Sequence, residues 1–409
     1  MFKKILSLVL AVMMIATLGI AFASCDNDNK GDGKDDFKLG VILLHDEHST
    51  YDFNFLQGIE EARVALGLTE TQVIIKKNIP ESNACYEAAC DLVDEGCDVI
   101  FADSFGHETY LLKAAKEYPD VEFCHATGTM AHTENLKNFH NAFAAIYEGR
   151  YLAGVAAGLK LNEMIEAGTI TADQAKMGYV GAFTYAEVMS GYTSFYLGAK
   201  SVCPSVTMEV QFTGSWYDEN AEKTTANALI DNGCVLISQH ADSMGAPTAC
   251  EDRNIPNVSY NGSTKADCPK TFIISSRINW APYIKYICEQ NIAGKEIAVD
   301  WTGTIATGSV VVTEINTQAA AAGTVEKIAE VKAALEAGTL KVFDTAKDDF
   351  ITVKGEKLTT YKADVDTDAN FTPDTEAVKD GFFHESEYRS APYFDVRIDG
   401  ITLLNENYG

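Results

Sequence analysis

The sequence predicts an α/β protein built from two doubly wound lobes, each a parallel sheet with helices on both faces. Short apolar runs alternate with longer amphipathic stretches, beginning with a strand at 38–44 and a helix at 53–66. The same alternation resumes at 177–182 and 189–201, which indicates a second unit of the same kind. Two such units predict a hinge and a central cleft between them.

Further strands, each followed by a helix, support this assignment. They lie at 99–102 and 108–117, at 206–212 and 219–231, and at 234–238 and 246–253. Asp218 can cap the helix at 219–231, and Thr324 can cap another helix at 325–337. Glycines follow both helices, where left-handed backbone ends a helix most easily.

The same patterns predict the domain boundaries. We expect lobe 1 at 38–158 with part of 271–312, lobe 2 at 159–270 with part of 313–338, and a C-terminal extension at 339–409. Late strands at 271–276 and 308–313 would complete the sheets. The extension contains Val-Lys-Gly-Glu-Lys, which is typical of a turn between short strands. We expect it to wrap one lobe or the hinge.

The N-terminus combines positive charge, an apolar run and small residues in front of a cysteine. Lys3 and Lys4 precede a nearly continuous apolar run at 5–22, and Ala23-Ser24 suit a signal peptidase. This arrangement resembles a bacterial lipoprotein signal, so we expect a signal peptide at 1–24, acylation of Cys25 and a flexible tether at 25–37. Alternatively the run is retained as a membrane helix. In both cases the body of the protein lies on the outer face of the cell membrane.

The charge balance argues against polyanionic partners. The chain has 59 acidic and 32 basic residues and a formal net charge of −27. Nucleic acid and anionic lipid surfaces would repel it. Of ten cysteines, nine follow Cys25 without C-x-x-C or metal-ligand spacing, and most stand in apolar runs. We therefore expect mostly free, buried thiols, although a disulfide is not excluded by the pattern.

Ligands of open parallel sheets bind at the carboxyl ends of the strands, so the loops after the strands are the candidate site. Two histidines and two carboxylates occupy 45–48, but no H-E-x-x-H and no third cluster accompany them. We therefore expect a polar cleft loop here and no metal. The next residues include Tyr51, Phe53 and Phe55, of which at least one should face the cleft.

The other loops place aromatic rings beside short polar side chains. Their polar and aromatic members include Asp103, Ser104, Trp216, His240, Asp242, Tyr260, Asn261, Asn279 and Trp280. Rings can stack on a flat neutral ligand while carboxylates and amides meet its edge, and a sugar would use similar groups. Few cations and no glycine-rich cradle disfavour a phosphorylated ligand. We find no G-x-S-x-G motif and no paired nucleophile and base, so we expect no enzymatic activity and no cofactor.

Several motifs resemble a known family. They occur in order at 101–106 (Phe-Ala-Asp-Ser-Phe-Gly), 125–128, 147–154 (Tyr-Glu-Gly-Arg-Tyr-Leu-Ala-Gly), 178–181, 214–218 (Gly-Ser-Trp-Tyr-Asp) and 239–243. Together they resemble the basic membrane protein family, whose members look like the purine nucleoside receptor lipoproteins of ABC importers. The resemblance implies a type I periplasmic-binding-protein fold that closes around its ligand. It also implies a permease and an ATPase on separate chains.

The resemblance also implies roles for single residues. Tyr51 and Asp52 stand where nucleoside binders have an aromatic ring and an amide. Trp216 matches a tryptophan of the branch similar to adenine binders, and Trp280 matches its Trp-Gly-Pro-Tyr motif, with alanine in place of the glycine. Asn261 and Asn279 occupy the places of an aspartate and a lysine that hold ribose. Recognition of ribose would thus be weakened, which favours a free nucleobase such as adenine.

Together with the family resemblance, these patterns predict a monomeric, lipid-anchored solute-binding protein of an ABC importer that binds a purine nucleobase or nucleoside. The expected ligand contacts are Trp216, Tyr51, Asp52, Ser104, Phe105, Asp242, Asn261, Trp280 and Asn279. Trp216 and Tyr51 would stack on the ring, while Asp52, Ser104 and Asp242 would meet its edge. The same fold binding riboflavin or a sugar, or serving as a surface sensor, remains the alternative.

Overall fold

The computed structural model describes residues 34–365 and 372–406. The chain from Phe37 onward forms one unit. The expected signal peptide, Cys25 and most of the expected tether lie outside the described residues.

Lobe 1 contains a six-stranded sheet in the order β11-β5-β4-β3-β1-β2, and all of its pairings are parallel. Its strands are β1 (Leu39–Ile42), β2 (Val73–Lys76), β3 (Val99–Ala102), β4 (Glu122–Ala126), β5 (Phe139–Ala144) and β11 (Asp300–Gly303). The strands are short, and the four central ones are almost wholly buried, as expected when helices cover both faces, whereas the edge strands β2 and β11 are mostly half-buried.

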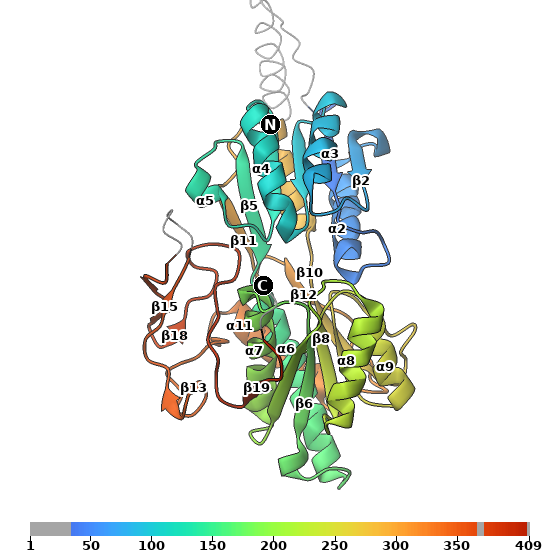
Figure 1. Ribbon diagram of the computed structural model, residues 1–409, viewed down its shortest axis with the longest axis vertical. Helices are drawn as coiled ribbons and strands as arrows, with labels where there is room; N and C mark the ends of the chain where they lie inside the picture. The colour runs from blue at the N-terminus through green and yellow to red at the C-terminus, as the bar shows by residue number, and fades with distance from the viewer. Residues whose placement is uncertain (1–33, 366–371, 407–409) are drawn as a thin grey trace, which may run out of the picture. The chain divides into compact units, whose positions relative to one another are not determined.

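The helices of lobe 1 divide between the two faces of this sheet (Figure 1). They are α2 (Thr50–Leu66), α3 (Asn83–Asp94), α4 (Glu108–Glu117), α5 (Ala131–Glu134) and α10 (Ala281–Ile292), with short 3₁₀ turns at Glu70–Gln72 and Phe105–His107. α2 and α10 pack closely, because a Cβ on Gly58 would lie 2.8 Å from the backbone nitrogen of Ala281. α3 and α4 pack on the opposite face through a separate apolar cluster that includes Leu92 and Leu111.

Lobe 2 contains a seven-stranded sheet in the order β12-β10-β9-β8-β6-β7-β19, in which only β12 is antiparallel to its neighbour. Its strands are β6 (Lys176–Gly181), β7 (Thr207–Phe212), β8 (Leu236–His240), β9 (Asn257–Tyr260), β10 (Phe272–Ile278), β12 (Val310–Val312) and β19 (Ile401–Leu403). Two doubly wound sheets are present, as the sequence predicted.

The helices of lobe 2 are α6 (Ile146–Glu166), α7 (Ala186–Val202), α8 (Glu219–Asp231), α9 (Gly245–Arg253) and α11 (Thr324–Glu336), and a 3₁₀ turn lies at Ala172–Gln174. α6 and α7 approach each other closely, since a Cβ on Gly154 would lie 2.0 Å from the carbonyl oxygen of Phe195. Asp218 caps α8 as expected, because its side chain accepts from the backbone N–H of Ala221 at 2.9 Å. The expected cap at Thr324 is wrong: Gly323 precedes α11, and the Thr324 hydroxyl donates to the Ala321 carbonyl oxygen instead.

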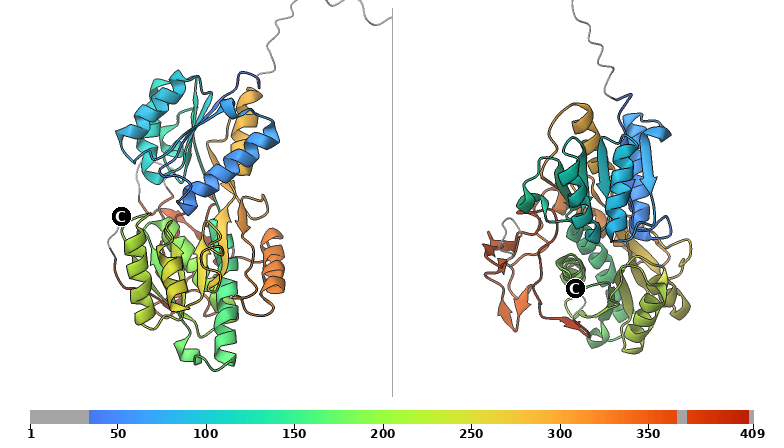
Figure 2. Two further views of the ribbon diagram at one scale, coloured as in Figure 1. Left: turned by 90° about the vertical axis from the view of Figure 1, so that its right-hand side faces the viewer. Right: turned by 45° about the horizontal axis from the view of Figure 1, so that its top comes forward.

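The chain passes between the lobes three times, after β5, between β10 and α10, and between β11 and β12. The first passage comes earlier than the expected boundary at residue 158, because α6 already packs on α7 in lobe 2. The left view of Figure 2 shows the two sheets and the segments that connect them.

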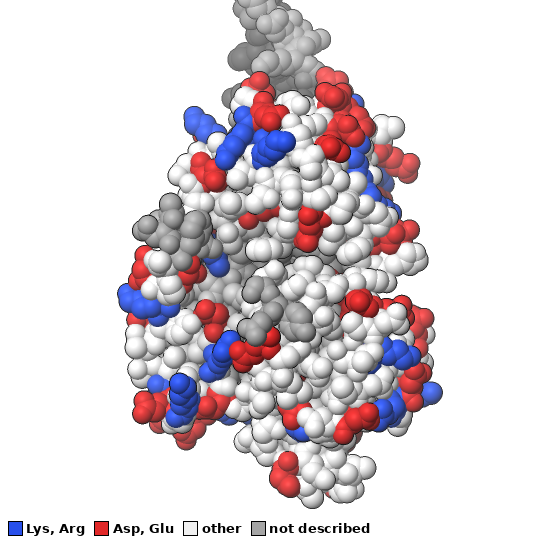
Figure 3. Space-filling view, viewed as in Figure 1, with Lys and Arg blue, Asp and Glu red and all other residues white. Residues whose placement is uncertain are grey.

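The C-terminal extension forms three small hairpins and then joins lobe 2. The hairpin strands are β13 (Thr352–Val353), β14 (Glu356–Lys357), β15 (Lys362–Ala363), β16 (Thr375–Glu376), β17 (Val378–Lys379) and β18 (Phe382–Phe383). The turn between β13 and β14 contains the Lys354-Gly355 pair with positive φ, as the sequence predicted. β19 then pairs with the edge strand β7, and Phe343 packs on Tyr147 beside the first passage. On the face drawn in Figure 3, basic side chains are interspersed with the more numerous acidic ones.

Candidate ligand-binding site

Residues from both lobes surround a cavity whose empty space, including the part open to solvent, is about 390 Å³. Its lining consists of Leu44, His45, Tyr51, Ser104, Phe105, Thr127, Glu187, Trp216, His240, Asp242 and Tyr260. These residues follow or end β1, β3, β4, β7, β8 and β9, or lie in the first turn of a helix. The cavity therefore occupies the carboxyl edge of both sheets, where the strand order predicts a ligand site.

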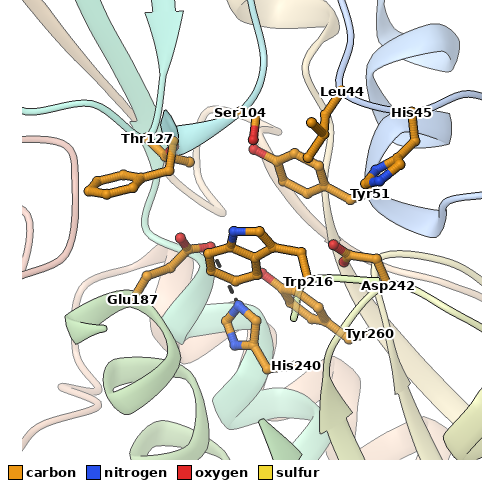
Figure 4. A pocket seen from close by; sticks show the side chains of 11 residues that line it. Leu44, His45, Tyr51, Ser104, Thr127, Glu187, Trp216, His240, Asp242 and Tyr260 are labelled. Carbon is orange, nitrogen blue, oxygen red and sulfur yellow. Dashed lines mark hydrogen bonds and ion pairs between the residues drawn. The ribbon is translucent and has the colours of Figure 1, made fainter. Parts of the chain in front are cut away.

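Aromatic rings form much of the cavity wall. In Figure 4 the indole of Trp216 lies between residues of lobe 1, among them Tyr51, and residues of lobe 2, among them Tyr260. Trp216 also packs edge-on against Phe183 at 5.1 Å between ring centroids. The hydroxyl of Tyr51 donates to the carbonyl oxygen of Asp103 at 2.7 Å, which holds its ring in place. Flat, apolar surfaces are thus available to a planar ligand.

Two carboxyl groups and a histidine supply polar contacts from lobe 2. Glu187 lies in the first turn of α7, and its Oε1 is 3.4 Å from His240 Nε2 (Figure 4). Burial lowers the pKa of His240, so its imidazole is neutral at pH 7. Burial, and next the charge of Glu222, raises the pKa of Asp242 well above its ordinary range. No lysine or arginine in the lining pairs with Glu187 or Asp242. A hydrogen-bond donor on a ligand would pair with their carboxyl groups.

A second pair of carboxyl groups lies behind the lobe 1 wall. Asp52 Oδ1 accepts from the backbone N–H of His45 at 2.7 Å, and Asp103 Oδ1 accepts from that of Leu44 at 3.0 Å. Burial and the charge of Asp52 raise the pKa of Asp103 well above its ordinary range. These two side chains shape the loop after β1 and do not line the cavity.

An arginine lies beneath the lobe 2 wall without any carboxylate partner among the residues described. Arg150, in α6, is fully buried, and its guanidinium donates to Ser238 Oγ at 2.7 Å, to Tyr179 Oη at 3.2 Å and to the Ser259 carbonyl oxygen at 3.2 Å. It lies 5.3 Å from the centroid of the Tyr260 ring. Arg150 thus joins neighbouring strands directly under the cavity and leaves a positive charge near its acidic wall.

Of the nine ligand contacts expected from the sequence, the structure brings five to the cavity. These are Tyr51, Ser104, Phe105, Trp216 and Asp242. Asp52 and Asn261 are buried immediately behind it. Trp280 is stacked on Phe55 at 4.4 Å in the core of lobe 1, and Asn279 Oδ1 accepts from the backbone N–H of Ala281 at 3.2 Å.

Six further residues line the cavity that were not expected as ligand contacts, namely Glu187, Thr127, Leu44, His45, His240 and Tyr260. His45, His240 and Tyr260 were visible as residues of the loops after strands. Glu187 had a subtler signal, a carboxylate in the first turn of the helix after β6. Within the described residues no cluster of three or more metal-ligating side chains is present, and all nine cysteines there are unpaired.

Two helix-covered parallel sheets with a cavity at their facing carboxyl edges define the class of two-lobed solute-binding proteins. A family model described as "ABC transporter substrate-binding protein PnrA-like" matches residues 41–340. The chain belongs to this family, Bmp, and the resemblance noted in the sequence is thereby confirmed. The family consists of transporter substrate-binding proteins and not of enzymes.

Three curated relatives show how similar the chain is to known proteins. It is 33% identical over 249 residues to a purine-binding protein of Brucella abortus, covering 60% of this chain and 66% of the relative. It is 36% identical over 186 residues to a putative ABC transporter glucose-binding protein of Haloferax volcanii, covering 46% of this chain and 44% of the relative. It is 26% identical over 279 residues to an ABC transporter nucleoside-binding protein of Lactococcus lactis, covering 65% of this chain and 72% of the relative. The chain spans less than two thirds of the length of the first two.

Solved structures confirm the two-lobed fold. A solute-binding protein of an ABC transporter system from Aeropyrum pernix superposes with a TM-score of 0.62 at 18% identity, covering 76% of this chain and 94% of that one. In the described part of this chain, no helix has the length and apolar character needed to cross a membrane.

Proposed function

We propose that this protein binds a purine in the cavity between its lobes and delivers it to an ABC permease, with a free nucleobase such as adenine preferred over a nucleoside. The observation that carries this proposal is the lining itself. Aromatic rings provide flat faces, Glu187 and Asp242 provide acceptors, and no lysine or arginine is present among the lining residues. An aminopurine offers N–H donors on its edge and two π faces, which match both features.

The charge of the cavity lining supports an uncharged ligand. Phosphorylated ligands would meet carboxyl groups with no lysine or arginine in the lining to compensate them. Asn261 stands where the family resemblance implies a contact to ribose, but it is buried behind the wall, which favours a base over its nucleoside.

The location and partners belong to the same proposal. Membership of the family implies a separate permease and ATPase, and the N-terminal sequence suits a lipid anchor on Cys25 at the outer face of the cell membrane. A tethered monomer would stay close to its permease even where no outer compartment confines it.

The direct test is to identify what the protein carries. Protein purified without added ligand is denatured, and the released small molecules are analysed by mass spectrometry. The unliganded protein is then screened by thermal shift against adenine, guanine, hypoxanthine, adenosine, riboflavin and glucose. We expect adenine to give the largest rise in Tm. A larger rise in Tm with riboflavin or glucose would identify that compound as the ligand in place of a purine. No change in Tm with any solute would favour a sensor role.

A further inference from the structure

Two buried asparagines connect the lobes behind the cavity. Asn54 lies in α2 of lobe 1, Asn261 follows β9 of lobe 2, and each side chain is 1% exposed. The amide nitrogen Nδ2 of Asn54 donates to Oδ1 of Asn261 at 3.2 Å. Neither residue lines the cavity. Their hydrogen bond therefore belongs to the contact between the lobes.

The connection continues to a group that does line the cavity. Nδ2 of Asn261 donates to Oδ1 of Asp242 at 3.3 Å. The other carboxyl oxygen of Asp242 remains for a ligand. A chain of two buried hydrogen bonds thus runs from a helix of lobe 1 to an acidic group of the cavity on lobe 2.

The backbone of Asp242 makes a second connection to α2. The backbone N–H of Thr50 donates to the carbonyl oxygen of Asp242 at 3.1 Å, and the Thr50 hydroxyl donates to the same oxygen at 3.2 Å. Asn261 adopts a left-handed φ of 62°, which is uncommon for a residue with a side chain. The lobe contact therefore fixes both the main chain and the side chain around Asp242.

We propose that Asn54 and Asn261 form a closure latch, a hydrogen-bonded pair that exists only when the lobes are closed and that positions Asp242 against the ligand. The latch deepens the proposed function and rests on it, because it acts through a residue of the ligand cavity. It makes Asn261 a positioning residue and not a contact to ribose. The latch serves any cleft ligand that meets Asp242.

The physical reason for a latch is the difference in hydration between the two states. In an open protein, water satisfies both amides. In the closed protein, removal of the Asn54 amide leaves the Asn261 carbonyl oxygen buried without this donor. Such a cost falls on the closed state alone, and for a buried neutral group it corresponds to about a tenfold change in an equilibrium constant. It should appear mainly as faster dissociation of the ligand.

Asn54→Ala tests the latch, because alanine suits a helix interior and should not prevent folding. Binding of adenine is followed by stopped-flow fluorescence. We expect dissociation about ten times faster, a nearly unchanged association rate and an unchanged Tm of the unliganded protein. Asn162→Ala is the matched control, since its amide donates to the Val202 carbonyl oxygen within lobe 2. Equal dissociation rates in wild type and Asn54→Ala would overturn the latch, as would a lower Tm of the unliganded variant with no kinetic change.

A double-mutant cycle separates the latch from a ribose contact. If Asn54 and Asn261 act as one pair, the effects of Asn54→Ala and Asn261→Ala on dissociation are strongly non-additive, and they are the same for adenine and adenosine. Additive effects, or a loss confined to adenosine, would contradict the latch.

Hydrogen exchange at the Thr50 amide, measured in the adenine complex, reports the lobe contact directly, because this amide is bonded across the lobes. We expect faster exchange in the Asn54→Ala complex than in the wild-type complex. The same rate in both would overturn the latch while purine binding stands. Failure of adenine to bind wild type would overturn the proposed function instead, and the same comparison is then made with the solute that raises Tm most.

Discussion

Glu187 and Asp242 place two carboxyl groups at the wall of the cavity. They face the cavity from two different elements of lobe 2, the first turn of α7 and the loop after β8. The neutral imidazole of His240 can donate to Glu187 from Nε2, which orients the carboxyl group but leaves its second oxygen for the ligand. Because no lysine or arginine lines the cavity, the proposed function assigns the remaining donors to the ligand.

The role of Glu187 can be tested by Glu187→Gln. The substitution keeps the shape but replaces one acceptor oxygen with a donor and removes the charge. Since hydrogen bonds to charged groups contribute about 1.5–3 kcal/mol, we expect adenine to bind about tenfold more weakly or worse. Isothermal titration calorimetry measures this loss. Glu326→Gln is the control, because Glu326 occupies the first turn of α11, away from the cavity. Unchanged affinity in Glu187→Gln would remove this residue from the ligand site.

At the residue scale, the sequence could indicate loops but not the direction of each side chain. Tyr51 and Asp52 are adjacent in the chain, yet Tyr51 lines the cavity and Asp52 bonds the backbone behind it. A step of one residue in a helix turns a side chain by about 100°, so composition alone cannot separate the two. Trp280 was expected beside the ligand, but its ring fills the core between α2 and α10.

At the scale of elements, the C-terminal extension is fixed to lobe 2 by an added strand. β19 pairs with β7 in parallel, and Asn405 bonds both the backbone N–H and the carbonyl oxygen of Phe212. Lys200 of α7 donates to the carbonyl oxygens of Asp349 and Phe350. The extension also reaches lobe 1, where the backbone N–H of Ser390 donates to Asp300.

The attachment of β19 depends on Gly400, which precedes it with a φ of 92°. A Cβ at this position would lie 1.9 Å from the hydroxyl of the buried Tyr196. We expect Gly400→Ala to lower the free energy of unfolding by about 2–4 kcal/mol through strain and overpacking. Gly355→Ala isolates the cost of positive φ, because no atom lies within 4 Å of its added Cβ. Urea denaturation would contradict this explanation if the two variants lost equal stability.

The alternation of strands and helices was predictable from sequence because period-two and period-3.6 patterns are local. The exchange of segments between lobes was not, since β11 belongs to lobe 1 and β12 to lobe 2 although both follow α10. Which sheet a late strand joins depends on contacts far away in the chain. The same is true of β19, whose pairing partner lies almost two hundred residues earlier.

For the whole molecule, the excess of acidic residues has a consequence for stability. Some of the carboxyl groups described are buried, and burial raises the pKa of Glu222 and of Glu385 to about 7. The folded protein therefore keeps protons on these groups between about pH 4.5 and 7, where the unfolded chain has lost them. Because the folded state binds more protons there, stability falls as pH rises through this window.

Glu385→Gln should reduce this loss of stability. Glu385 lies in the extension, 3% exposed, and a shift from 4.5 to about 7 corresponds to about 3 kcal/mol lost by pH 8. Glutamine stays neutral, so we expect the variant to be more stable than wild type at pH 8 and similar to it at pH 4.5. Urea denaturation at several pH values measures this. Parallel stability curves for the two proteins would show that Glu385 does not titrate in this range.

The central claim, that the cavity between the lobes recognises a free purine base, is tested most directly by calorimetric titration of unliganded wild-type protein with adenine and adenosine. We predict one site per chain and an affinity for adenine at least tenfold higher than for adenosine, because the lining contains no lysine that could hold the ribose. Tighter binding of adenosine, or heat from neither ligand, would contradict the account.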